Sequence, residues 1–99
     1  MKEVLTLLKQ EQQGDYNFFW KTAATQGFVS LFSDEEEMRE VVRTALKMIA
    51  VQGHPDFLQR FSYGTDVFWC LSNAENGTKM SDFADGFYPQ VTFLLPSEY

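Results

Sequence analysis

The chain has 99 residues, of which 44% are apolar and 16% aromatic, a composition that excludes intrinsic disorder and predicts one globular domain over 1–99. Eight Lys and Arg stand against 14 Asp and Glu, for a net charge of −6. Because nucleic-acid binders carry basic patches, direct nucleic-acid binding is disfavoured, whereas a basic protein partner fits the charge.

Four helices are predicted in the first two thirds of the chain, over about 2–13, 15–26, 34–52 and 55–61. The strongest pattern belongs to 34–52, where apolar residues recur at spacings of three and four: Met38, Val41, Val42, Ala45, Leu46 and Ile49. Gly53 and Pro55 end this helix.

Two strands are predicted after the helices. The segment 65–72 is short and rich in valine, aromatics and cysteine, and 90–95 has a similar composition before Pro96. The fold class that follows is α+β, with the helices packed on a small antiparallel C-terminal sheet. A mostly α-helical bundle is the alternative, because periodicity alone does not distinguish a short apolar strand from a buried helical segment.

Four consecutive acidic residues, 34–37, begin the helix over 34–52. Ser33 and Glu36 have the spacing of a capping box, and negative charge in the first turn complements the helix dipole. This local role accounts for most of the run. The remaining acidity suggests a docking patch for a cationic partner, with Asp34, Glu35 and Glu37 as contact residues.

A second candidate surface lies within 75–90, where aromatic and acidic side chains are interspersed with turn residues. Aromatic anchors surrounded by acids suit a protein interface, and the candidate contact residues are Asp82, Phe83, Asp85, Phe87 and Tyr88. The competing interpretation is that Phe83 and Phe87 fill the core from a loop.

Residues for catalysis or metal binding are scarce. Cys70 lies in an apolar run and His54 precedes a proline, so both are interpreted as structural rather than as a nucleophile and its base. One cysteine and one histidine do not complete a usual zinc site, and no phosphate-binding loop motif is present. We therefore expect no cofactor, no metal and no enzymatic activity.

The single cysteine excludes an intramolecular disulfide, and no stretch approaches the roughly 18–20 apolar residues of a membrane span. We expect a cytoplasmic protein without membrane contact, and a homo-oligomer is compatible with the sequence.

The leading hypothesis is an acidic inhibitor that covers the basic surface of a nucleic-acid-processing protein, as a toxin immunity, anti-CRISPR or antirestriction protein would. The alternative is a small-ligand-binding or catalytic domain with an aromatic-lined pocket built from Trp20, Trp69 and neighbouring phenylalanines.

Overall fold

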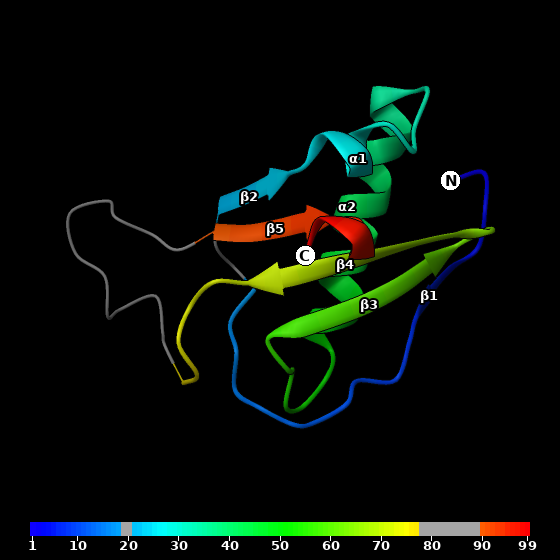
Figure 1. The fold of residues 1–99 in the computed structure, drawn as a ribbon. Coiled ribbons are helices and arrows are strands. Elements are labelled where there is room, and N and C mark those ends of the chain that lie inside the picture. The colour runs from blue at the N-terminus through cyan, green and yellow to red at the C-terminus, as the bar shows by residue number, and fades with distance from the viewer. Residues whose placement is uncertain (19–20, 78–89) are drawn as a thin grey trace.

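The computed structural model describes residues 1–18, 21–77 and 90–99, which form one sheet with one long helix packed on it (Figure 1). In chain order the elements are β1 (Leu5–Leu7), β2 (Lys21–Ala24), α1 (Gln26–Val29), α2 (Glu35–Ala50), β3 (Leu58–Tyr63), β4 (Asp66–Ser72), β5 (Gln90–Leu94) and a 3₁₀ turn, η2 (Pro96–Glu98). The α+β class is thereby confirmed, and the alternative of a helical bundle is wrong. Within the described ranges, no helix is both long and apolar enough to cross a membrane.

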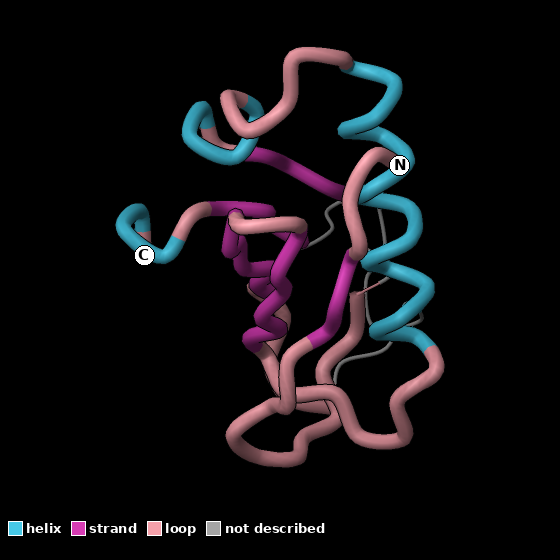
Figure 2. Tube along the Cα trace, turned by 90° about the vertical axis from the view of Figure 1, so that its right-hand side faces the viewer, coloured by secondary structure: helices cyan, strands magenta, loops and turns pink. Residues whose placement is uncertain are grey.

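The described strands form a five-stranded sheet in the order β1-β3-β4-β5-β2. All neighbours are antiparallel except β2, which runs parallel to β5. Helix α2 forms a second layer on one face of this sheet, as the rotated view shows (Figure 2). Strands β1 and β2 are therefore the two edges of the sheet.

The two predicted strands are confirmed as β4 and β5, and they pair antiparallel with Trp69 opposite Leu94. The sheet is nevertheless larger than predicted, because three further strands flank this pair. The two predicted strands are antiparallel to each other, as expected, but the parallel pairing of β2 with β5 makes the sheet as a whole mixed.

Helix α2 confirms the prediction over 34–52, with observed bounds of Glu35–Ala50. Its buried residues are Val41, Ala45 and Ile49, which repeat every four residues. The N-cap is Asp34, whose extended backbone lets its side chain accept a hydrogen bond from the Glu36 amide at 2.9 Å. The capping box predicted for Ser33 and Glu36 is therefore wrong, because the helix begins one residue later.

The helices predicted over 2–13 and 15–26 are wrong. The first segment contains β1, with Leu5 opposite Tyr63 and Leu7 opposite Phe61. The second contains β2, and of its described residues only the last, Gln26, belongs to a helix, the short α1. Over so short a stretch both periods can be found: Leu5 and Leu7 have the spacing of a strand face, and Leu5 and Leu8 have the spacing of a helix face. The distant strands β3 and β5 supply the hydrogen bonds that decide the outcome.

The helix predicted over 55–61 is also wrong, since this part of the chain leads into β3. Along β3 the side chains alternate between buried Gln59, Phe61 and Tyr63 and half-buried neighbours. That period of two is the burial pattern of a strand covered on one face. The alternation continues in β4, where Phe68 and Cys70 are buried on the helix side.

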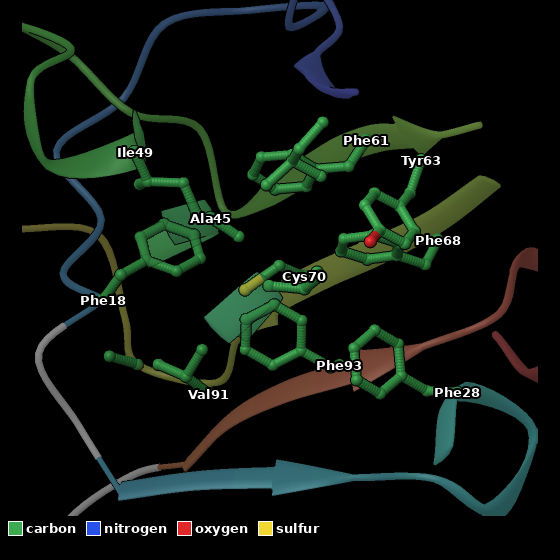
Figure 3. Packing of buried hydrophobic residues seen from close by; sticks show 13 residues of the cluster. Phe18, Phe28, Ala45, Ile49, Phe61, Tyr63, Phe68, Cys70, Val91 and Phe93 are labelled. Atoms are coloured by element: carbon green, nitrogen blue, oxygen red, sulfur yellow. The ribbon is translucent and has the colours of Figure 1, made fainter. Parts of the chain in front are cut away.

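The core lies between α2 and the helix-side face of the sheet (Figure 3). Four phenylalanine rings dominate it, all with relative exposures of 0–1%: Phe28, Phe61, Phe68 and Phe93. Phe61 and Phe68 stack with ring centroids 5.2 Å apart, and Phe28 meets Phe68 edge-on at 5.0 Å. Aromatic rings are thus the largest fully buried side chains in the described part of the chain.

Candidate functional site

Three segments bring carboxylates to one end of the molecule: residues 1–4, the start of α2 and the β3–β4 turn. Contacts between Tyr63, Glu37 and the amides of Lys2 and Glu3 hold these segments together. We call this region the acidic end and define it by its seven carboxylates, Glu3, Asp34, Glu35, Glu36, Glu37, Glu40 and Asp66. The cationic groups in the same three segments are the Met1 amino group, Lys2 and Arg39.

Glu37 is bound within the fold. Its carboxylate accepts hydrogen bonds from the Tyr63 hydroxyl and from the Lys2 amide, the latter at 3.1 Å. The Tyr63 bond holds the pKa of Glu37 below its usual value, with a further lowering by Lys2. Burial and the Glu37 carboxylate raise the pKa of Tyr63 in turn. Glu37 therefore stabilises the N-terminal arm, which is residues 1–4, as well as contributing charge.

The other two predicted contact residues of the first surface are more exposed. Glu35 forms an ion pair with Arg39 at 2.8 Å, in which the two side chains are 71% and 65% exposed. Asp34 caps the helix but stays exposed. Two further carboxylates lie beside them: Glu40, which pairs with the Met1 amino group, and Glu36, which has no side-chain partner among the described residues.

Exposed apolar side chains occur at this same end. Val4 is 77% exposed beside the β3–β4 turn, where its carbonyl accepts a hydrogen bond from the Gly64 amide. Val67, near the start of β4, and Met1 are 43% and 48% exposed. Gly64 has a φ of +60°, which lets the turn close tightly against the side chain of Glu3. The acidic end thus combines charge with apolar contact area.

The predicted contact residues of the second surface lie outside the described residues. Asp82, Phe83, Asp85, Phe87 and Tyr88 all fall between Gly77 and Gln90. Their proposed role in partner binding stays a prediction.

Cys70 and His54 occupy different environments. Cys70 is fully buried among the core rings, and burial raises the pKa of its thiol far above the usual value (Figure 3). His54 lies in an exposed loop, where its Nδ1 is 3.2 Å from an Asp15 carboxylate oxygen. This geometry does not form a cysteine–histidine catalytic pair. In the described part of the chain, no group of three or more His, Cys, Asp or Glu side chains could hold a metal ion.

A pocket of about 290 Å³ opens between α2 and the edge strand β2. Its lining comes from β2, α1, α2 and β5: Thr22, Ala23, Ala24, Phe28, Met38, Arg39, Val42, Arg43 and Phe93. Trp20 lies outside the described residues, and Trp69 points to the opposite face of the sheet, where its ring meets Tyr99 at 5.5 Å.

The sequence does not reveal the pocket, because a helix is predicted over 15–26, where the structure has β2. A usable signal existed in α2, where Arg39 and Arg43 are one turn apart beside apolar Met38 and Val42. That spacing indicates a helix flank that is both cationic and apolar, but it does not reveal what lies opposite.

Comparison of the chain with known protein families, with curated proteins and with solved structures finds no significant match.

Proposed function

We propose that the protein is a non-enzymatic binding domain whose acidic end docks on a basic protein. The observation that carries the proposal is the gathering of seven carboxylates and several exposed apolar side chains at one end of the fold. Complementary charge accelerates encounter and fixes the orientation of the partners, while the apolar side chains supply contact area.

The partner class follows from charge. A surface that normally binds phosphates is strongly cationic, so carboxylates from this end occupy the places of phosphates by steric and electrostatic mimicry. An inhibitor of a nuclease or of another nucleic-acid-binding effector is the finer proposal. Toxin immunity, anti-CRISPR activity and antirestriction activity are the three roles of that kind, and the residues of the acidic end serve each equally well.

The test compares two variants that each remove two negative charges. Glu36→Gln with Asp66→Asn changes the acidic end and spares both the cap and the Tyr63 contact, whereas Glu11→Gln with Glu75→Gln changes exposed residues elsewhere. Proteins that co-purify with each tagged form from the cell of origin are identified. The association rate of the purified partner is then measured over a range of salt concentrations.

We expect a basic partner whose association rate falls as salt rises, because exposed charges more than about 10 Å apart are screened at 0.1 M salt. The acidic-end variant should associate several-fold more slowly at low salt, and the control should behave like the unchanged protein. An association rate that does not respond to salt, or equal losses in both variants, would contradict the proposal.

A further inference from the structure

The pocket beside β2 arises from small side chains on an edge strand. Thr22 and Ala24 stand opposite the buried Val91 and Phe93 in the register, so they face the helix, where they present little volume, and β2 is only four residues long. Behind them, the rings of Phe28 and Phe93 lie 5.2 Å apart and form an apolar wall. The space left between strand and helix therefore has apolar surface available for a ligand.

The wall is held in place by contacts that do not fill the pocket. Glu98 accepts hydrogen bonds from the Thr25 hydroxyl at 2.6 Å and from the Gly27 amide at 3.3 Å. These bonds fasten the C-terminal turn to the beginning of α1, which carries Phe28. The Thr25 bond is the main reason that the pKa of Glu98 is below its usual value. The aromatic wall is thus preformed.

Two arginines of α2 accompany the apolar wall in the lining of the pocket. Arg39 is engaged by Glu35, whereas Arg43, one turn further along α2, has no hydrogen-bond or ion-pair partner among the described residues. Both line the pocket. A planar guanidinium binds a carboxylate through two parallel hydrogen bonds, which makes Arg43 the available anion-binding group.

We propose that this pocket binds a small monocarboxylate that carries an apolar tail of medium length. The tail packs against Phe28, Val42 and Phe93, and the carboxylate meets the guanidinium of Arg43. The pocket volume lies at the lower end of the roughly 300–1,000 Å³ range of small-molecule sites, which suits a ligand of this size. This binding site adjoins the acidic end through the Glu35–Arg39 ion pair, but it does not depend on the function proposed for that end.

The surrounding charge selects a monoanion over a polyanion. Glu35 already offsets Arg39, and the chain as a whole carries a net charge of −6. A ligand with several negative charges would meet repulsion from these groups, whereas one carboxylate is matched by one free guanidinium. A cationic or neutral ligand with the same tail would leave Arg43 without its counter-charge.

Octanoate is the probe for this site, and octylamine and 1-octanol are matched probes with the same tail. Binding is followed by amide chemical shifts of the full chain and by calorimetry. We expect saturable octanoate binding, with shift changes concentrated in β2, around Val42 and at Phe93. Octylamine should not bind at the same site. The affinity for 1-octanol should be at least about tenfold lower than for octanoate, because a charge-assisted hydrogen bond is lost.

Arg43→Gln removes the proposed carboxylate partner, and Lys47→Gln removes a positive charge from the next turn of α2 outside the pocket. Octanoate affinity should fall about tenfold or more in the first variant and stay unchanged in the second. The proposal is overturned if octanoate does not saturate in the millimolar range, if 1-octanol binds equally well, or if both variants lose affinity alike. Binding of a peptide along β2 with no binding of octanoate would also overturn it.

Discussion

The two flanks of helix α2 differ in what they face. On the β1 flank, Glu37 and Glu40 are held by the N-terminal arm, through the Lys2 amide and the Met1 amino group, and Tyr63 closes the contact from the sheet. On the β2 flank, Arg39 and Arg43 border a pocket, and the facing strand carries alanines. One helix therefore has a flank sealed by its own chain and a flank open to a ligand.

This difference shows how one amphipathic helix serves both stability and recognition. Charged groups that find partners within the fold stabilise it and contribute less to binding an outside partner. A charged group without a partner contributes little to stability, but it is available to a ligand. The two flanks can therefore be separated by substitutions that test stability on one side and binding on the other.

The largest expected effect comes from the β1 flank. Tyr63→Ala removes a ring that is 5% exposed, together with the hydroxyl that binds Glu37 and two backbone amides. We expect a loss of about 3–5 kcal/mol in the free energy of unfolding, measured in urea. Val42→Ala on the β2 flank should cost roughly 1 kcal/mol or less, because that side chain is half-buried beside an existing pocket. Equal losses would show that the two flanks are packed alike.

The start of the helix, which both flanks share, gives the next largest effect. Asp34→Ala removes the side chain that accepts from the Glu36 amide, and should lower the free energy of unfolding by about 1 kcal/mol. Ser33→Ala is the matched control, since Ser33 lies before the cap and should tolerate the change. Chemical denaturation gives the free energy of unfolding of both variants. A larger loss in Ser33→Ala than in Asp34→Ala would show that Ser33 is the N-cap.

The Glu37 contact should make stability depend on acid. Because its pKa is lower in the folded protein than the ordinary 4.5, the folded state binds the proton less readily than the unfolded state. This stabilisation is complete above the unfolded pKa and is lost as the pH falls through the folded pKa, that is, below about 4.5. The free energy of unfolding is measured from pH 6 down to pH 3, a range set by ordinary carboxyl pKa values of about 4. It should fall more steeply with decreasing pH for the unchanged protein than for Glu37→Gln. Parallel curves would contradict the assignment.

The smallest effect on stability is expected from Arg43→Gln on the β2 flank. Since Arg43 has no partner among the described residues, the free energy of unfolding should change by about 0.5 kcal/mol or less. Thermal and urea unfolding are sufficient to measure this. A substantially larger loss would mean that Arg43 serves the fold, and the contrast between a sealed and an open flank would then fail.

Prediction from sequence succeeded where local signals agree and failed where partners are distant. Helix α2 has sixteen residues, a repeated apolar spacing and an acidic first turn, so its existence follows from local rules. Strands β1 and β2 have three and four residues, too few for periodicity to distinguish a strand from a helix. Of the candidate site, Asp34 and Glu35 were expected at the helix start and lie exposed there, whereas the attachment of Glu37 to Tyr63 has no sequence signal.

The sequence alone determined the elements whose stability depends on neighbouring residues: α2, the apolar strands β4 and β5, and the excess of negative charge. Tertiary structure decided the identity of β1, β2 and β3, the parallel pairing at one edge and the pocket beside it. The physical reason is that a short strand is stabilised by hydrogen bonds and side chains from strands far along the chain. A pocket is likewise a property of two surfaces, and a sequence pattern describes only one of them.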